Sequence, residues 1–297
     1  MPYAFLSLLS QPITNKSMLM SLEDKLIDLA IAEDIGDGDH SSLSCIPSDA
    51  KGEVHLMLKD SGILAGVEVA QRIYHRIDSQ INFTPFLTDG ALVKHGDIGF
   101  SAMGRIHSLL QAERIVLNVM QRMSGIASQT NIYVKRIEGT RAKVLDTRKT
   151  TPGMRVFDKL AVRIGGGHNH RMGLYDMIML KDNHVDFAGG IKQAIEKANN
   201  YLKSTGRRLD IEVETRNFDE IQQVLEMGGV RRIMLDNFSV ENTRTAVALI
   251  NGRFEVESSG GITLDTIRAY AEAGVDFISV GALTHQIKSL DMNLKKV

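Results

Sequence analysis

Residues 209–237, LDIEVETRNFDEIQQVLEMGGVRRIMLDN, decide the fold expected for this chain. An apolar run, 209–214, is followed by a helical pattern and then by a second apolar run, 232–236. A strand, a helix and a second strand in this order are typical of a βα unit, whose two strands run parallel. The stretch therefore predicts a parallel sheet with helices packed against it.

The same alternation recurs along the second half of the chain. Six apolar runs predict six strands, at residues 143–146, 177–180, 209–214, 232–236, 254–258 and 277–280. Their spacing fits closure into a barrel better than an open, doubly wound sheet. We therefore expect an α/β barrel.

Polar residues cluster where these runs end, and the carboxyl ends of barrel strands are where active sites lie. The clusters are Asp146-Thr-Arg-Lys149, Lys181-Asp-Asn-His184, Glu212-Val-Glu214, Asp236-Asn237, Ser258-Ser-Gly-Gly261 and Gly281-Ala282. Glu212 and Glu214 lie two residues apart, so both side chains point to one face of their strand. Apolar flanks make that face the barrel interior, and two carboxylates there indicate a polar function.

The first part of the chain predicts a smaller α+β domain. An amphipathic helix begins after Ser21, which caps it, and ends in a loop at residues 34–42. Strand-like segments and further helices follow: strands at 52–59, 62–65 and 82–86, a helix near 67–78 and a long helix over 108–124.

Composition indicates a globular enzyme. The 297 residues are 43% hydrophobic, which is enough for one large domain or two unequal ones. The single Cys45 excludes an internal disulfide and a thiolate metal cluster, so we expect the cytosol. The apolar start of the chain lacks the basic region of a signal peptide and is too short to span a bilayer, which predicts a tail over 1–20 and no membrane association.

Positive charge is concentrated in one window. Residues 146–184 hold seven Lys and Arg against four Asp and Glu, although the formal net charge of the whole chain is −1. Local positive charge favours a compact anionic substrate over a nucleic acid, and the chain has no Trp and no basic stripe.

Three strand ends in and near this window carry cations. Arg148-Lys149 alone is as typical of a solvated turn as of a binding site. The recurrence of cations at His170-Arg171, after a Gly-Gly-Gly run, and at Lys181 brings five donors together if the barrel closes. Arg offers a planar fork and Lys a point charge, a mixture suited to a ligand that carries both carboxylates and phosphates.

Two glycine-bearing turns, Ser258-Ser-Gly-Gly-Ile-Thr and Val280-Gly-Ala-Leu-Thr, come after the last two strands. Each predicts backbone amides at the start of a helix, which is the usual phosphate site of a barrel, although plain tight turns have the same pattern. The pair His168-Asn-His170 lacks the spacing of a zinc site, and Gly36-Asp-Gly38 lacks the third glycine of a dinucleotide fingerprint. We assign no function to His168.

Together these motifs resemble the quinolinate phosphoribosyltransferase family, over about residues 33–284. The resemblance is carried by the segments Asp34-Ile-Gly-Asp-Gly-Asp39, Gln111-Ala-Glu-Arg114, Asp146-Thr-Arg-Lys-Thr-Thr-Pro-Gly-Met-Arg155, Gly165-Gly-Gly-His-Asn-His-Arg-Met-Gly-Leu174, Lys181-Asp-Asn-His184, Glu212-Val-Glu214, Leu235-Asp-Asn-Phe238, Ser259-Gly-Gly-Ile262 and Ser279-Val-Gly-Ala-Leu-Thr284.

The resemblance implies an incomplete, TIM-like α/β barrel with an N-terminal α+β open-faced sandwich. We expect the sandwich over 21–125, the barrel over 126–285, and a C-terminal segment, 286–297, that returns to the first domain. It also implies a homodimer with shared active sites, in which each small domain caps the partner's barrel, or a higher, hexameric assembly.

The implied reaction is that of a pentosyltransferase in de novo NAD biosynthesis. Quinolinate and phosphoribosyl pyrophosphate give nicotinate mononucleotide, pyrophosphate and CO2, with Mg2+ required.

The resemblance also implies residue functions. Arg148, His170 and Arg171 hold the two quinolinate carboxylates with Arg114 of the neighbouring subunit, while Thr147 lines the site. The catalytic residues are Lys149, Glu214 and Asp236: Lys149 and Lys181 serve the carboxylates and the pyrophosphate, and the two acids hold the ribose hydroxyls, directly or through Mg2+. Ser259, Gly260, Gly261, Gly281 and Ala282 cradle the 5'-phosphate.

Two alternatives remain at this point. One is a related phosphoribosyltransferase with another acceptor, either nicotinate or that of a molybdenum-associated homologue. A monocarboxylate would leave Arg114, Arg148 and Arg171 in excess. The other is a non-catalytic barrel that senses a phosphorylated ligand, which Glu214 and Asp236 disfavour because acids repel a polyanion.

Overall fold

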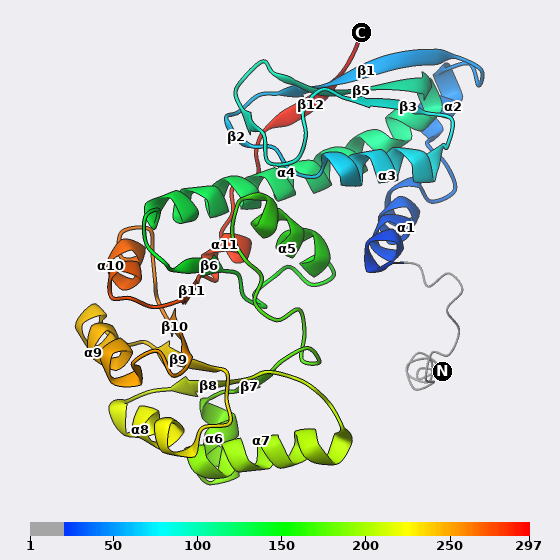
Figure 1. The fold of residues 1–297 in the computed structure, drawn as a ribbon. Coiled ribbons are helices and arrows are strands. Elements are labelled where there is room, and N and C mark those ends of the chain that lie inside the picture. The colour runs from blue at the N-terminus through cyan, green and yellow to red at the C-terminus, as the bar shows by residue number, and fades with distance from the viewer. Residues whose placement is uncertain (1–20) are drawn as a thin grey trace.

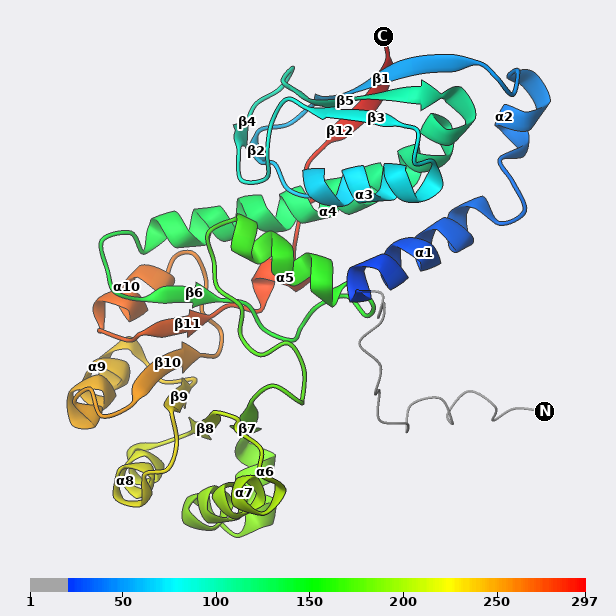
Figure 2. The same cartoon turned by 45° about the vertical axis from the view of Figure 1, so that its right-hand side comes forward.

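The computed structural model describes residues 21–297, so the tail predicted over 1–20 lies outside the described residues. A sheet domain and a barrel are joined by the long helix α4, Ile106–Arg136, which passes beneath the sheet and over the barrel (Figures 1 and 2). This arrangement confirms the predicted fold class.

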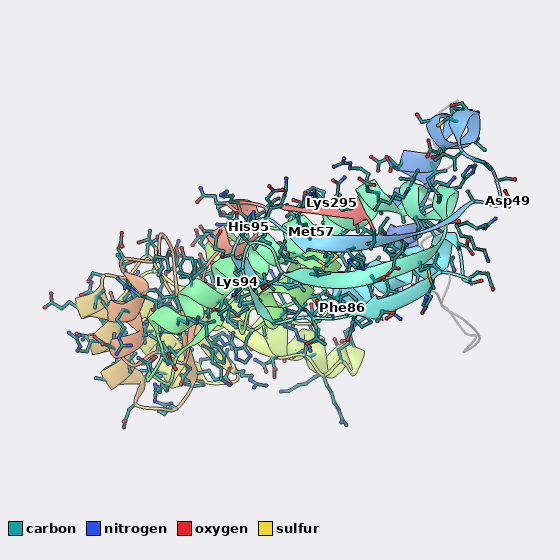
Figure 3. The ribbon with its side chains drawn as sticks, turned by 90° about the horizontal axis from the view of Figure 1, so that it is seen from above. Asp49, Met57, Phe86, Lys94, His95 and Lys295 are labelled. Atoms are coloured by element: carbon teal, nitrogen blue, oxygen red, sulfur yellow. The ribbon has the colours of Figure 1, made fainter. Side chains whose placement is uncertain are left out.

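The sheet domain has four antiparallel strands in the order β12-β1-β5-β3. These strands are β12 (Met292–Lys296), β1 (Lys51–Leu58), β5 (Ile98–Arg105) and β3 (Asn82–Pro85). α4 and α3 (Val67–Ile77) cover one face, toward which the fully buried Leu56 and Phe100 point. The described chain leaves the other face uncovered, and Met57 and Phe86 lie there (Figure 3). The sandwich is therefore open-faced, as predicted.

The barrel consists of six parallel strands in the order β6-β11-β10-β9-β8-β7. The strands are β6 (Lys143–Leu145), β7 (Ile178–Leu180), β8 (Ile211–Thr215), β9 (Arg232–Asp236), β10 (Glu255–Ser259) and β11 (Phe277–Ser279). β6 and β7 form the two edges of this sheet. The barrel is incomplete because its ring stays open between them.

Helices alternate with the strands and pack outside the ring, as the sequence pattern predicts (Figure 1). They are α5 (Arg155–Ile164), α6 (Asp182–Ala188), α7 (Ile191–Thr205), α8 (Phe218–Met227), α9 (Val240–Ile250), α10 (Ile267–Glu272) and α11 (Ala282–His285). Each βα connection therefore lies at the same end of the ring, and the polar strand ends come together there.

The first domain also holds four short elements that differ in how well the sequence predicts them. α1 (Leu22–Ile35) begins where expected, with Ser21 Oγ accepting the amide of Asp24 at 3.1 Å. The predicted loop at 34–42 is wrong in its second half, because Asp39 caps a short helix, α2 (His40–Cys45). β2 (Gly62–Ile63) pairs with β4 (Leu92–Val93).

α4 is longer than the helix predicted over 108–124, and it runs through the expected domain limit at residue 125. Gly125 is typical of a helix end, but here it allows a close approach. A Cβ at this position would lie 2.3 Å from the carbonyl oxygen of Lys288. The glycine therefore lets the C-terminal segment cross the helix without ending it.

Two strands of the sheet, β5 and β12, are absent from the predicted strands. β5 contains Gly99, Ser101 and Gly104, which weaken its apolar alternation, and β12 is a polar segment that pairs with β1 across the whole sequence. Such pairing is set by tertiary contacts and not by local propensity. No helix among the described residues is long and apolar enough to cross a membrane.

Candidate active site

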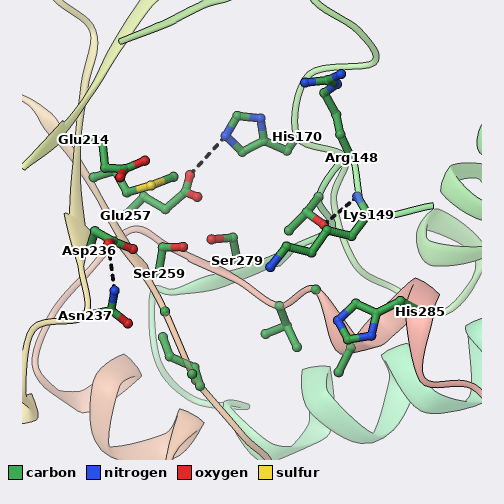
Figure 4. Close-up of a pocket in the computed structure, with 18 of the residues that line it drawn as sticks. Arg148, Lys149, His170, Glu214, Asp236, Asn237, Glu257, Ser259, Ser279 and His285 are labelled. Carbon is green, nitrogen blue, oxygen red and sulfur yellow. Dashed lines mark hydrogen bonds and ion pairs between the residues drawn. The ribbon is translucent and has the colours of Figure 1, made fainter. Parts of the chain in front are cut away.

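A pocket of about 920 Å³ lies at the carboxyl ends of the barrel strands (Figure 4). Thirteen of the fourteen site residues predicted from the sequence line it: Thr147, Arg148, Lys149, His170, Arg171, Lys181, Glu214, Asp236, Ser259, Gly260, Gly261, Gly281 and Ala282. They come from separate turns along the second half of the chain. Arg114 is the exception, because it is exposed on α4 and does not line this pocket.

Two guanidinium groups, of Arg148 and Arg171, form one end of the pocket. Burial, and then the positive charge of Arg148, lower the pKa of Arg171. The Arg171 side chain donates to the carbonyl of Met177 at 3.2 Å, and the buried Nε of Arg148 has no partner among the described residues. Neither guanidinium has a salt bridge to an acid of the described chain, so this end of the pocket suits an anionic ligand.

A buried ion pair fixes the Gly-rich loop that carries His170 and Arg171. Asp146, at the end of β6, accepts from Lys159 Nζ and from the amide of His170, the latter at 2.8 Å. Lys159 also donates to the His170 carbonyl at 3.0 Å. Burial raises the pKa of Asp146 to about 6, and the nearby Lys159 cation opposes that rise. Lys159 and Asp146 thus position the loop instead of contacting ligand.

The His170 ring already has a neighbour at each nitrogen. Nδ1 accepts the backbone amide of Arg171 at 2.7 Å, and Nε2 lies 2.9 Å from Glu212 Oε2 and 3.6 Å from Glu257 Oε2. His170 lines the pocket, and the carboxylate function predicted for it stays a prediction.

The opposite side of the pocket is acidic. Glu214 is buried, and Lys181 Nζ lies 3.6 Å from its Oε2. Burial raises the pKa of Glu214, Lys181 lowers it, and Asp236 and Asp182 raise it further. Asp236 Oδ2 accepts from the side-chain amide (Nδ2) of Asn237 at 2.7 Å. As expected from their spacing, Glu212 and Glu214 both point inward, with Glu212 fully buried.

The two glycine turns differ in their position relative to the next helix. Gly281 directly precedes α11, as predicted, whereas the turn at Gly260 and Gly261 is separated from α10 by five residues, so a helix start there is wrong. Gly260 has φ +96°, and a Cβ on it would lie 2.1 Å from Asn237 Oδ1. A Cβ on Gly281 would lie 3.0 Å from Lys149 Cδ. Both glycines keep backbone open toward the pocket.

Other lining residues were given no function from the sequence, although Asp182, Asn237 and Ser279 belong to its polar motifs. They include Asp182, Asn237, Glu257, Ser279 and His285. Glu257 obeys the alternation that identified Glu212 and Glu214, because it lies two residues before Ser259 on an inward-facing strand. That signal was available for Glu257, whereas His285 depends on the position of α11.

Among residues 21–297, one group has the geometry to hold a metal ion, namely His170, Glu212 and Glu257. Of the pair His168-Asn-His170, whose spacing does not fit a zinc site, His170 is the residue that belongs to this group. Arg232 donates to Glu257 Oε2 at 2.8 Å and so already supplies a positive charge there.

An incomplete α/β barrel with a pocket of cations facing two acids, at its strand ends, defines an enzyme class that binds phosphorylated and carboxylated small molecules. Comparison with known proteins specifies the class further. The model of the quinolinate phosphoribosyl transferase C-terminal domain matches residues 126–295, and that of the N-terminal domain matches 39–124. The chain belongs to the quinolinate phosphoribosyltransferase family.

Relatives resemble the chain over nearly its full length. It is 45% identical to the chloroplastic nicotinate-nucleotide pyrophosphorylase [carboxylating] of Arabidopsis thaliana, with 91% of this chain and 81% of that protein covered. It is 38% identical to a probable nicotinate-nucleotide pyrophosphorylase [carboxylating] of Bacillus subtilis, with 91% and 92% covered. The crystal structure of NadC from Streptococcus pyogenes matches with a TM-score of 0.87 at 38% identity, covering 95% of this chain and all of that one.

Proposed function

We propose that this chain is a decarboxylating quinolinate phosphoribosyltransferase, which converts quinolinate and phosphoribosyl pyrophosphate to nicotinate mononucleotide, pyrophosphate and CO2. The observation that carries the proposal is the pair Arg148 and Arg171, which face the pocket with no acidic partner in the described chain. A ligand with two adjacent carboxylates supplies the negatively charged partners that these guanidinium groups lack.

The acidic side of the pocket suits the sugar. As the bond to pyrophosphate breaks, positive charge develops on the ribose ring, and the Glu214 and Asp236 carboxylates lie where they stabilise it. Lys149 and Lys181 stabilise the departing pyrophosphate. The open backbone at Gly260 and Gly281 fits the 5'-phosphate, because amides there are not screened by side chains.

Mg2+ is the metal that we propose for the reaction. Mg2+ prefers one or two carboxylates together with substrate phosphates, and Asp236 at the mouth of the pocket is suited to this. When bound, the ion supplies charge that stabilises the leaving pyrophosphate. Glu214 stays with the ribose hydroxyls, since Lys181 already neighbours it.

A homodimer completes the site in this proposal. Arg114 is exposed on α4 and outside the pocket of its own chain. Beside it, an apolar groove of about 250 Å³ runs between α1, α3, α4 and α5, with Leu29, Ile115 and Phe157 in its walls. A partner subunit seated on this surface would bring each Arg114 to the other subunit's barrel.

The cytosolic location expected from the cysteine content stays a prediction. Plant relatives are named as chloroplastic or mitochondrial proteins.

The test is incubation of the purified protein with Mg2+, phosphoribosyl pyrophosphate and quinolinate labelled in the carboxyl at C2, with nicotinate as the parallel acceptor. We expect CO2 and nicotinate mononucleotide in equal amounts from quinolinate and no nucleotide from nicotinate. Nucleotide from nicotinate without CO2 would transfer the chain to the non-decarboxylating alternative, and no product from either would contradict a transferase.

A further inference from the structure

Beneath the pocket, four ionisable side chains meet inside the barrel. Glu212 comes from β8, Arg232 from β9, Glu257 from β10 and His170 from the Gly-rich loop. Both glutamates have no exposed surface, and Glu257 also lines the pocket (Figure 4). Ligand atoms of His170 and the two glutamates all lie within 4.8 Å of one another.

This cluster has too little positive charge for its acids. The Arg232 guanidinium lies 2.8 Å from Glu257 and 4.0 Å from Glu212, and it also bonds Glu255 at 3.1 Å. Arg231 also bonds Glu255 at 3.1 Å, so Arg232 is the cation that Glu212 and Glu257 share. His170 adds no positive charge to the cluster. Its Nδ1 accepts the backbone amide of Arg171, so the ring must be neutral with its proton on Nε2.

Two adjacent buried carboxylates that share part of one cation do not both ionise. Burial raises the pKa of Glu212, whereas the charge of Arg232 and a hydrogen bond from Glu257 lower it, so the shared proton belongs on Glu257. Burial, and then the negative charge of Glu212, raise the pKa of Glu257 to about 8. Apart from the bond between the two glutamates, Glu257 Oε1, both carboxylate oxygens of Glu212 and the hydroxyls of Ser258 and Ser279 have no hydrogen-bond partner in the described chain, and of the two glutamates only Glu257 lines the pocket.

The reaction proposed for this pocket needs an acid. When CO2 leaves the ribosylated pyridine, the bond from C2 to the carboxylate breaks and its electron pair stays on C2. A proton must then bond to C2 to give nicotinate mononucleotide. Of the other acids of the pocket, Glu214 and Asp236 serve the ribose in the proposed function, Asp182 lies at the start of α6, and the Nε2–H of His170 faces Glu212.

We propose that Glu257 is the catalytic acid that protonates C2 as CO2 departs, before CO2 can return to C2, and that Glu212 and Arg232 are its positioning residues. The O–H bond of Glu257 breaks as the C2–H bond forms, leaving a carboxylate beside Arg232. Water restores the proton once product leaves. This inference rests on the proposed function.

The experiment is a single turnover of quinolinate with phosphoribosyl pyrophosphate and Mg2+, in which pyrophosphate and CO2 are both timed. In the wild type the two should appear together. In Glu257→Gln, which keeps the shape and removes the acid, we expect pyrophosphate at a near wild-type rate. CO2 and nucleotide should be slower by on the order of a hundredfold, with ribosylated quinolinate accumulating.

Glu255→Gln is the matched control, because Glu255 lies on the same strand and bonds the same Arg232 but does not line the pocket. It should leave the two product rates equal to each other. If Glu257→Gln slowed pyrophosphate and CO2 equally, the residue would have a structural role and the proposal would be overturned. The proposal would also be overturned if Glu257→Gln released both products at wild-type rates. Absence of pyrophosphate from the wild type would instead contradict the proposed function itself.

The wild type gives a second test that does not depend on how the variant folds. Glu257 must be protonated to donate, so the ratio of CO2 to pyrophosphate in the first turnover should fall as pH rises through the pKa of Glu257, about 8. The reverse step needs the carboxylate, so exchange of the C2 hydrogen of nicotinate mononucleotide in D2O should rise over the same range. The groups that face Glu257, namely Glu212, Arg232, His170 and Ser279, set this pH. Two flat profiles would overturn the proposal.

Discussion

Arg148 and Arg171 show how a binding residue differs from a structural one at the scale of single side chains. Arg232, also buried, bonds Glu255 and Glu257, so its charge is satisfied by the fold. For Arg171, burial and then the positive charge of the half-buried Arg148 lower the pKa. The buried charge of Arg171 is unfavourable until a ligand anion arrives, and this is why the pocket should bind carboxylates tightly.

Arg148→Ala should weaken quinolinate binding about 10- to 100-fold, because a charge-assisted hydrogen bond contributes roughly 1.5–3 kcal/mol. Calorimetric titration with quinolinate measures the loss. Arg163→Ala is the control, since Arg163 is an exposed residue of α5 away from the pocket and its loss should leave the affinity unchanged. Unaltered binding in Arg148→Ala would refute the carboxylate function of this residue.

Glu214→Gln tests the charge on the acidic side. It keeps the shape of the side chain but removes the carboxylate that faces developing positive charge, so kcat with saturating phosphoribosyl pyrophosphate should fall on the order of a hundredfold. Steady-state kinetics check this, with Glu226→Gln as a surface control that pairs only with exposed groups. If kcat were retained and KM alone rose, Glu214 would serve binding and not the transition state.

Single residues were predictable where they stand at the end of a strand that the sequence identifies. Glu214 and Asp236 close clear apolar runs, and both lie in the pocket. The neighbours of His170 could not be predicted, because the hydrogen bond to its Nδ1 and the approach of Glu212 depend on how the Gly-rich loop folds back over β6.

At the scale of elements, the Gly-rich loop depends on β6 and α5 together. Asp146 ends β6, Lys159 lies in the middle of α5, and both bond the backbone of His170 from opposite sides. Through Lys159, α5 therefore determines where His170 and Arg171 lie relative to the barrel strands. Neither Asp146 nor Lys159 lines the pocket, yet both hold the loop that does.

Lys159→Met should lower the free energy of unfolding by roughly 3–5 kcal/mol, because it leaves Asp146 as an uncompensated buried charge. Urea denaturation measures this loss of unfolding free energy. Lys192→Met, at an exposed position on α7, is the control. Adding Asp146→Asn should recover part of the stability, since the charge is gone, but not the activity, since the loop loses its anchor. If Lys159→Met alone were as stable as the wild type, this account would be contradicted.

Elements were predictable in proportion to how locally they are determined. The six barrel strands carry apolar runs between helices, and their observed bounds stay close to the predicted ones. β12 and the extension of α4 are different, because both depend on the C-terminal segment. That segment crosses α4 at Gly125 and then pairs Leu294 with Leu56, near the other end of the chain.

At the scale of the whole molecule, the barrel alone does not assemble every residue that the family resemblance implies. Thirteen of the predicted site residues share one pocket, and Arg114 lies outside it on α4. α4 connects the two domains, so a residue on its exposed side is available to a second copy of the chain. The homodimer that we propose accounts for both facts if its two-fold interface brings each subunit's α4 to the other's barrel.

Mixing inactive variants tests this arrangement. Arg114→Ala and Lys149→Ala should each be inactive as homodimers. If Arg114 serves the partner's pocket, a mixed dimer holds one site with both changes and one intact site. Random exchange of equal amounts makes half of the dimers mixed, so about a quarter of the wild-type activity should return in the whole mixture and about half in the purified mixed dimers.

The matched control is a mixture of Arg148→Ala and Lys149→Ala. Both residues line the pocket of their own chain, so every site in a mixed dimer lacks one of them and no activity should return. Subunits are exchanged by co-expression with two different tags, and activity is measured on the doubly tagged fraction. Restored activity only in the Arg114 mixture would place Arg114 across the interface. Because Arg114 then acts in trans, separating the subunits by dilution should abolish turnover in the wild type as well. If neither mixture regained activity while the doubly tagged dimer formed, Arg114 would act within its own chain or not at all.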